Sequence, residues 1–315
     1  MQARRVLGAA IILLLLASII SSIYLALDSK ISQNSTSLNF KNINLSAKDT
    51  IGVVDINGQI YASGQDGGLV GSGSALTSIL ENLQAFAEDD KIKAVIIRIN
   101  SPGGTVGAVQ EIVAEVENVK RTGKPVVASV ADIAASGGYY IASACDKIVA
   151  NPGSIVGSIG VILISADMSR LLDKIGISME IVKSGPYKDA GSFHRPLSKE
   201  EKKFMNDLVL DAHEQFVSAV SRGRNIPTEE VQKFSEGQLF TGRMAADKKL
   251  VDVLGGMSIA KKVTEELAGI EDSVLVRKRL PGWKQILRVF NSGISLDGIL
   301  AVKNRLTGIA YIYRQ

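Results

Sequence analysis

The sequence predicts an α/β fold with a mainly parallel sheet, and three observations support this prediction. Short apolar runs with strand character alternate with amphipathic stretches of helical period. Glycine-containing turns follow two of the apolar runs, at 101–104 and 134–138. Apolar residues form 46% of the 315 residues and charged residues 22%, a balance typical of globular proteins. Strands that alternate with helices at these lengths are typical of βαβ units.

The first repeat of this alternation starts at residue 51. An apolar run at 51–56 is expected to form a buried strand, and the glycine-rich stretch 63–74 is expected to form a loop. That stretch lacks the spacing of phosphate-binding glycine motifs. A helix is expected from about 75 to 88, because apolar residues recur there at helical spacing: Leu76, Ile79, Leu80, Leu83 and Phe86.

The alternation continues along the chain and then gives way to helices. The next elements are expected to be a strand at 94–99, a helix at 105–121, a strand at 125–130 and a short helix from the turn at 134–138 to about 144. After Ser198 the pattern is helical: one long helix at 198–224, a new start at Pro227, and a last helix at 257–267.

The N-terminal segment has the length and composition of a membrane anchor. Residues 6–27 carry no charge, and at about 1.5 Å per residue they span a hydrocarbon core of roughly 30 Å. A cleaved signal peptide is the alternative, but its apolar region is shorter and ends in a small-residue site that is poorly matched here. Arg4 and Arg5 predict that residues 1–5 are cytoplasmic. A single-pass cell-membrane protein is expected, with the chain after the linker at 28–49 outside the cytoplasm.

The formal net charge of +4 is unevenly distributed. Residues 274–315 carry a net charge of +7, so the rest of the chain sums to −3. We treat 271–315 as a basic C-terminal extension. A membrane surface fits it better than nucleic acid, because no nucleic-acid reader motif is present. The single cysteine, Cys145, excludes an intramolecular disulfide and is expected to be a small buried residue.

Ser136 is a candidate nucleophile because it lies in a turn directly after a predicted strand. In open α/β sheets, sites form beyond the carboxyl ends of the strands, where loops meet helix N-termini. Gly137 and Gly138 leave the hydroxyl uncrowded, and the amide of Gly137 can donate to a developing oxyanion. Gly104, in the other strand-end turn, can supply a second donor. The same pattern also fits a helix cap or an ordinary turn.

A serine nucleophile needs a general base, and three residues are considered. His213 lies within a predicted helix and is expected to be a surface or capping residue. His194 lies in a loop beside Arg195 and remains a candidate. Lys188 lies in the turn-rich segment 184–192, and burial can lower the pKa of a lysine toward neutrality. From the residues alone, an ordinary exposed loop lysine is the simpler interpretation.

No cofactor or metal is expected. The sequence lacks an HExxH motif and clustered histidine or cysteine ligands. It also lacks the GxSxG turn of α/β-hydrolases. An SxxK spacing at 258–261 lacks its partner motifs, so chance accounts for it.

Four motifs in order resemble a known family. They are INSPGG at 99–104, AASGGYYIA at 134–142, NPGSIVGSIGV at 151–161 and SGPYKD at 184–189. Together they resemble the short form of signal peptide peptidase A, a family of Ser–Lys peptidases on the Clp/crotonase-like fold. The resemblance runs from about residue 50 to 270, with the N-terminal anchor in addition.

The resemblance implies a fold, a site and an assembly. The fold is one of repeated ββα units around a mainly parallel sheet, in a peptidase domain at 50–270. Ser136 would be the nucleophile and Lys188 the general base, with the amides of Gly104 and Gly137 as the oxyanion hole. Ser158 would hydrogen-bond the lysine. Members of the family form a homo-oligomeric ring, an octamer in the short form, and degrade signal peptide remnants at the membrane.

Two interpretations from other classes stay open at this point. One is a crotonase-type acyl-thioester enzyme, which shares the strand-end oxyanion arrangement but depends on coenzyme A, which is scarce outside the cytoplasm. The other is an inactive ring that acts as a scaffold for membrane peptides. Labelling of Ser136 by a fluorophosphonate would separate both from a protease.

Overall fold

The computed structural model describes residues 48–62, 74–277 and 309–312. Those after Lys48 belong to one compact unit, Asp49–Gln315. The predicted anchor at 6–27 and residues 63–73 of the predicted glycine-rich loop lie outside the described residues, and Ser74 begins a short strand. Within the described ranges, no helix is both long enough and apolar enough to span a bilayer.

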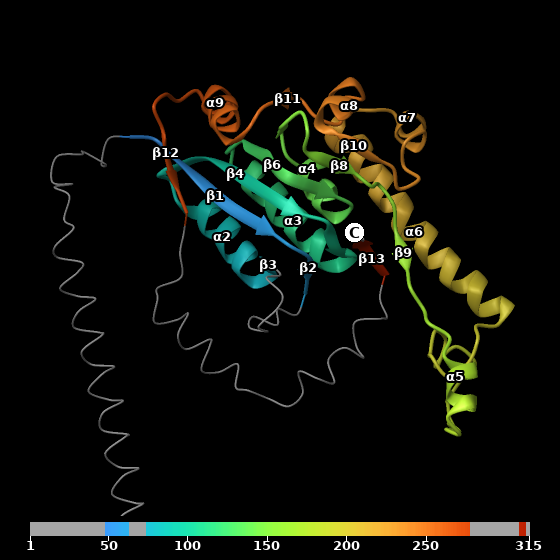
Figure 1. The fold of residues 1–315 in the computed structure, drawn as a ribbon. Helices are drawn as coiled ribbons and strands as arrows, with labels where there is room; N and C mark the ends of the chain where they lie inside the picture. Colours follow the sequence, from blue (N-terminus) through green and yellow to red (C-terminus); the bar gives the residue numbers. More distant parts are fainter. Residues whose placement is uncertain (1–47, 63–73, 278–308, 313–315) are drawn as a thin grey trace, which may run out of the picture. The chain divides into compact units, whose positions relative to one another are not determined.

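The main sheet is parallel except at one edge (Figure 1). Its strands are β1 (Thr50–Asn57), β4 (Ile92–Ser101), β6 (Val126–Ala135), β7 (Lys147–Ala150), β8 (Ile155–Gly157), β10 (Leu239–Thr241), β11 (Val253–Leu254) and β12 (Val274–Val276). The order is β10-β8-β6-β4-β1-β12, and β7 pairs with β6 and β11. Within this sheet, the β10–β8 pair is the only antiparallel pair among the described strands. The predicted mainly parallel α/β fold is confirmed.

A second, smaller sheet contains the strands that directly follow β1 and β4 in the chain. Its order is β3 (Ser74–Ala75), β2 (Ile60–Tyr61), β5 (Gly103–Thr105), β13 (Ile309–Ile312) and β9 (Ile162–Leu163). The chain passes from β1 into β2 and β3, and from β4 into β5, so each of the first two repeats contributes strands to both sheets before its helix. This arrangement agrees with the ββα repeat that the sequence resemblance implies.

Helices cover both faces of the main sheet. The helices among the described residues are α2 (Leu76–Glu88), α3 (Val106–Arg121), α4 (Gly137–Ser143), α5 (Ser169–Lys174), α6 (Lys199–Arg224), α7 (Thr228–Gln232), α8 (Gly242–Asp247) and α9 (Met257–Ala268). Figure 1 shows α2 and α3 below the sheet and α9 above it. The predicted bounds of α2, α3, α6 and α9 agree with these to within a residue or two.

Alternation along β1 explains the two layers. Val54 and Ile56 join the larger core with Leu83 of α2, whereas Ile51 and Val53 face the other side in the cluster that α9 covers. All five side chains are at most 3% exposed. Because successive side chains of a strand point to opposite faces, a buried strand needs apolar residues at consecutive positions.

Two elements extend beyond the predicted bounds. β6 continues to Ala135, five residues past the predicted strand end, through the partly polar stretch 131–133. Its end is stabilised by pairing with β8, a tertiary contact that no local pattern reveals. β12 pairs with β1, so the main sheet extends past residue 270.

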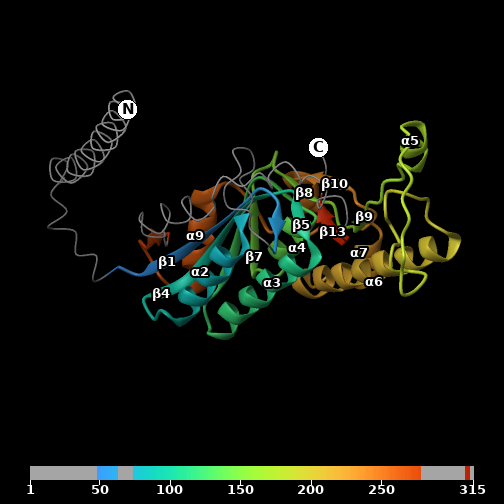
Figure 2. The same cartoon turned by 90° about the horizontal axis from the view of Figure 1, so that it is seen from below.

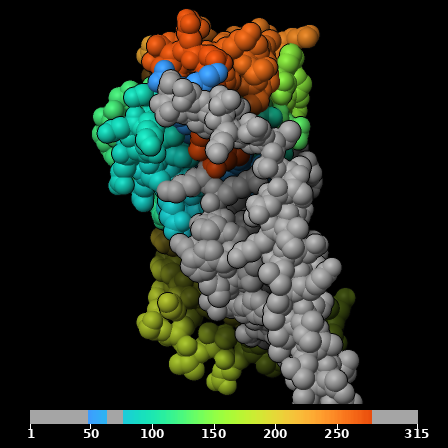
Figure 3. Space-filling model, turned by 90° about the vertical axis from the view of Figure 1, so that its left-hand side faces the viewer, coloured from blue at the N-terminus to red at the C-terminus, as the bar shows by residue number. Residues whose placement is uncertain are grey.

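Residues 164–198, called the arm below, contain α5 and connect β9 to α6. α5 has no buried residue. In Figures 1 and 2 it lies away from the main sheet, and in Figure 3 the yellow-green atoms of this region lie apart from the orange atoms of α8 and α9.

Candidate active site

Ser136 occupies the turn between β6 and α4. Its amide donates to the carbonyl oxygen of Gly157 at 2.8 Å, and its own carbonyl accepts from the amide of Tyr140 at 2.9 Å. Its φ is 52° and its ψ −121°, a conformation that favours glycine. Non-glycine residues persist in such conformations only where the surrounding structure holds them, and they cluster at functional sites.

The hydroxyl of Ser136 is buried and unsatisfied. The residue is 1% exposed, and among the described residues its Oγ has no hydrogen-bond partner. Ser136 occupies the N-cap position of α4, but its side chain makes no capping hydrogen bond. Buried hydroxyls are otherwise almost always hydrogen-bonded, and an exception requires an explanation such as a reactive role.

The structure brings the two glycine turns together. Gly137 is the first residue of α4, where an amide has no acceptor within the helix. The next residue, Gly138, lies so close to the turn after β4 that an added Cβ would be 2.7 Å from the carbonyl oxygen of Ser101. Gly104 lies in β5, which contacts α4. Both expected amide donors therefore lie in neighbouring elements.

Gly104 has no room for a side chain. A Cβ at this position would overlap the carbonyl group of Ile60 in the neighbouring strand β2. β13 pairs with β5 on its other side, with Tyr311 opposite Gly104. The position therefore requires glycine for close backbone approach.

Ser158 lies beside Ser136. Ala135 of β6 is paired with Gly157 of β8, so the two serines are the next residues along neighbouring parallel strands. Ser158 has a φ of 51° and is 8% exposed. Its amide donates to the carbonyl oxygen of Gln238 at 2.7 Å.

Lys188 and His194 both lie in the arm. The amide of Lys188 closes a turn on the carbonyl oxygen of Gly185 at 3.2 Å, and the residue is exposed. His194 Nε2 is 3.6 Å from Asp189 Oδ2. Since Ser136 Oγ has no partner among the described residues, neither candidate base reaches it within one protomer.

His213 has the structural role expected of it. It lies in α6, and its Nε2 is 2.7 Å from the carbonyl oxygen of Ser235. Cys145 is 1% exposed, and burial raises the pKa of its thiol above the usual range. Neither residue adjoins Ser136 in any contact that the structure records.

The sequence interpretation missed a cluster in the arm. Arg195 binds both Asp189 and Glu201, and Glu201 also forms a capping box with Ser198 at the start of α6. The capping box was detectable from the Ser-x-x-Glu spacing. The pairing through Arg195 depends on the fold of the arm.

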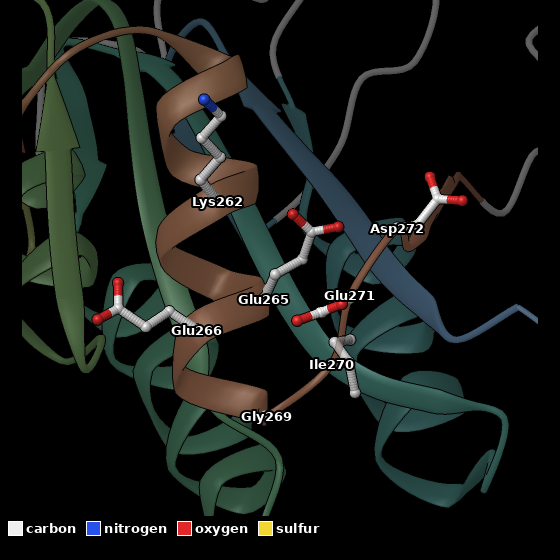
Figure 4. A pocket seen from close by; sticks show the side chains of 7 residues that line it. All are labelled: Lys262, Glu265, Glu266, Gly269, Ile270, Glu271 and Asp272. Atoms are coloured by element: carbon white, nitrogen blue, oxygen red, sulfur yellow. The ribbon is translucent and has the colours of Figure 1, made fainter.

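An open pocket lies on the opposite face of the main sheet from α4, at the C-terminal end of α9 (Figure 4). It is lined by Lys262, Glu265, Glu266, Gly269, Ile270, Glu271 and Asp272. The Glu265 carboxylate accepts from the Ser273 amide and hydroxyl, each at 2.8 Å. These hydrogen bonds connect α9 to the residue before β12, so Glu265 has a structural role.

Two protein families match parts of this chain. The model of peptidase family S49 matches residues 118–271, which include Ser136 and Lys188. The Clp protease model matches residues 70–154, which include Gly104 and Gly137.

Individual relatives share the same region. A candidate protease of Synechocystis sp. is 42% identical over 228 residues, which are 72% of this chain and 81% of the relative. The chloroplastic serine protease SPPA of Arabidopsis thaliana is 34% identical over 226 residues, 71% of this chain and 33% of the relative. Protease 4 of Haemophilus influenzae is 32% identical over 233 residues, 74% of this chain and 37% of the relative. The chain belongs to peptidase family S49.

Proposed function

We propose that this chain is a membrane-anchored serine endopeptidase with Ser136 as nucleophile and Lys188 as general base. Its proposed substrates are signal peptide remnants and other apolar peptides at the membrane. The observation that carries the proposal is the state of Ser136, whose buried hydroxyl is unsatisfied among the described residues and whose backbone is held at positive φ. A reactive group explains this state and a structural serine does not.

The proposed mechanism is acyl transfer through a serine ester. The neutral amine of Lys188 takes the proton of Ser136 Oγ while Oγ attacks the carbonyl carbon of the scissile peptide. The amides of Gly104 and Gly137 donate to the carbonyl oxygen as it becomes negative. The lysine ammonium then protonates the leaving nitrogen as the C–N bond breaks. Water, deprotonated by the same lysine, hydrolyses the ester and regenerates the hydroxyl.

The position of β13 supports binding of substrates as extended strands. β13 runs antiparallel to β5 on one side and to β9 on the other, with Tyr311 opposite Gly104. A strand in this place has its backbone next to a proposed oxyanion donor. Main-chain pairing of this kind gives affinity that is largely independent of peptide sequence. The chain's own C-terminal strand would then compete with substrate.

We also propose that the site is completed in a homo-oligomeric ring, an octamer by family resemblance. Lys188 is exposed in the protomer, so a neighbouring copy can supply it to Ser136. The arm supports such a contact because it presents many exposed apolar side chains: Met168, Leu171, Ile175, Ile177, Met179, Ile181 and Val182. Surfaces rich in exposed apolar groups mark protein or membrane contacts.

The proposed anchor is the segment 6–27, followed by a linker at 28–49 and the peptidase domain, whose predicted end at 270 is extended by β12 to Val276. Residues 1–5 would be cytoplasmic and the peptidase domain extracytoplasmic. The C-terminal segment 271–315 is basic, and we propose that its part outside β12 and β13 lies near the membrane surface or a neighbouring subunit. No nucleic acid and no cofactor take part in the proposed reaction.

A fluorophosphonate probe tests the nucleophile and the base together. We expect labelling of the full chain at Ser136 and loss of labelling and of peptide cleavage in Ser136→Ala and Lys188→Ala. Cleavage should fall at least about 10⁴-fold in each. Full activity in Lys188→Ala, with loss in His194→Ala, would instead assign a Ser–His pair.

A mixing experiment tests the shared site. Ser136→Ala and Lys188→Ala protomers are inactive alone, but co-assembled rings contain some sites with both wild-type residues if two chains build each site. We expect partial recovery of cleavage after co-expression. No recovery, in rings shown by mass to contain both variants, would place both residues in one chain.

A further inference from the structure

Three residues outside the proposed dyad form an ion cluster beside Lys188. Asp189 is the next residue along the chain, Arg195 follows in the same segment, and Glu201 lies in the first turn of α6. Arg195 Nε and Nη2 donate to the two Asp189 carboxylate oxygens at 2.9 and 2.6 Å. Arg195 Nη1 and Nη2 donate to the two Glu201 carboxylate oxygens at 2.8 and 2.6 Å. One guanidinium therefore binds two carboxylates in bidentate geometry.

The cluster is shielded although the arm around it is exposed. The Asp189 side chain is 9% exposed and that of Glu201 is 5% exposed. Hydrogen bonds from Arg195, with Lys183 as second donor, hold the pKa of Asp189 well below its usual range. Hydrogen bonds from Arg195 lower the pKa of Glu201 to about 2. Both carboxylates are therefore ionised throughout the neutral range.

The turn that carries Lys188 is attached to α6 on both sides of the lysine. Before it, the ring of Tyr187 packs against the ring of Phe204 of α6, with centroids 5.3 Å apart. After it, Asp189 is joined to Glu201 of α6 through the ion cluster. The backbone of residue 188 is thereby located relative to a 26-residue helix, while its side chain stays exposed.

The carboxylate nearest in sequence to Lys188, that of Asp189, is bound by other side chains. Asp189 is faced by Lys183 Nζ at 2.7 Å and by His194 Nε2 at 3.6 Å, as well as by Arg195. Among the described residues, Lys188 takes part in no ion pair. This matters for a general base, because a free carboxylate beside an amine stabilises its charged, inactive form.

We propose that Arg195 is a positioning residue for Lys188: it fixes the turn that carries the amine and keeps the Asp189 carboxylate away from it. This inference rests on the proposed function, in which Lys188 is the general base. It assigns catalytic importance to a residue that is remote from Ser136 in sequence and does not touch the hydroxyl.

The test measures kcat/KM for a peptide substrate against pH in the full-length assembled protein. In Arg195→Met we expect a fall of about tenfold or more, because a displaced base loses reactive geometry. We also expect the acid limb of the profile to move up by about one pH unit, since Asp189 loses its bidentate partner, keeps Lys183 on one oxygen and can pair with Lys188. The double variant Asp189→Asn/Arg195→Met should return the acid limb to its wild-type position while the rate stays low.

Two further variants separate positioning from general loss of structure. Glu201→Gln leaves Arg195 on Asp189, so the rate should fall without a shift of the acid limb. Lys203→Met breaks an exposed ion pair with Asp207 on the same helix and should change neither quantity. Thermal melting and particle mass identify any variant that fails to fold or assemble. If Arg195→Met fails, the rate of Glu201→Gln tests the positioning role, and an unchanged rate would overturn it.

The outcomes are distinguishable. If Arg195→Met and Glu201→Gln keep the wild-type rate and pH profile while Lys188→Ala is inactive, the positioning role is wrong and the dyad stands. A rate loss in Arg195→Met without any shift of the acid limb would mean that the cluster only stabilises the turn and does not keep the Asp189 carboxylate away from Lys188. If Lys188→Ala is active, the proposed dyad fails and this inference fails with it.

Discussion

The amide of Ser136 donates a hydrogen bond of 2.8 Å to the carbonyl oxygen of Gly157, the last residue of the neighbouring strand β8. This bond, together with the hydrogen bond from Tyr140, holds the turn after β6 from both sides. It explains how a serine persists at a φ of 52° with its hydroxyl unsatisfied among the described residues. The pairing of β6 with β8 therefore fixes the backbone of the candidate nucleophile.

The strain at Ser136 predicts a difference between two inactive variants. Glycine adopts this conformation freely, whereas alanine retains a Cβ and the cost of about 1–3 kcal/mol for a non-glycine residue. Ser136→Gly should therefore melt about 2–4 °C or more above Ser136→Ala. Scanning calorimetry on matched preparations measures the difference. Equal melting temperatures would mean that the turn is unstrained.

Close approach at Gly104 predicts a severe effect of a single methyl group. Gly104→Ala must push β2 away from β5 and displace the proposed oxyanion donor, so cleavage and fluorophosphonate labelling should both fall by about 10²-fold or more. Gly107→Ala is the matched control, because a Cβ there meets nothing within 4 Å. Gly107 lies in α3, so its replacement by alanine should leave the free energy of unfolding unchanged or raise it by up to about 1 kcal/mol. Similar activities for the two variants would contradict the tight packing of β2 on β5.

The packing of α6 on α4 predicts that a remote substitution weakens the site. Phe216 is fully buried, and its ring stacks on that of Tyr140 with centroids 4.8 Å apart. Phe216→Ala should destabilise the fold by about 3–5 kcal/mol and reduce labelling of Ser136. Phe216→Leu preserves more of the volume and should cost less than about 1.5 kcal/mol. Denaturant unfolding measures the loss of unfolding free energy in each variant, and the loss should be clearly larger in Phe216→Ala.

The pairing of Glu265 predicts acid sensitivity at the attachment of α9 to β12. Hydrogen bonds from Lys261 and then Ser273 lower the pKa of Glu265 to about 2, from 4.5. A carboxyl group with a lowered folded-state pKa contributes stability above its unfolded pKa and loses it as pH falls. The melting temperature of the wild type should thus drop between about pH 4.5 and pH 2, and less steeply in Glu265→Gln. Glu266→Gln, a neighbouring exposed residue, serves as control and should keep the wild-type slope.

The location of β13 predicts that the C-terminus competes with substrate. A chain that ends after residue 308 lacks the strand that pairs with β5 and β9. We expect a lower KM for peptide substrates and an unchanged kcat, since the proposed catalytic residues remain. Steady-state kinetics on the truncated and full chains measure both. A higher KM would show that β13 builds the groove and does not compete for it.

Local patterns were sufficient for most of the secondary structure. Helical spacing located α2, α3, α6 and α9, and apolar runs located β1 and β4, because burial on one or both faces imposes a period on the sequence. The full length of β6 was missed, since its polar end is stabilised by β8 and not by its own residues. The ion cluster of the arm was missed for the same reason: Arg195 pairs with residues on both sides of it in the chain.

The sequence by itself determined the α/β class, the order of the elements and the residues to consider, because these follow from periodicity, turn chemistry and motif order. Only the tertiary structure decided that Ser136 is buried and unsatisfied among the described residues, and that the helix it precedes, α4, contacts the strand β5 that contains Gly104. It also showed that Lys188 stays exposed and does not reach Ser136 within one protomer. These relations depend on strands and helices far apart in the chain, and no local pattern encodes the distance between them.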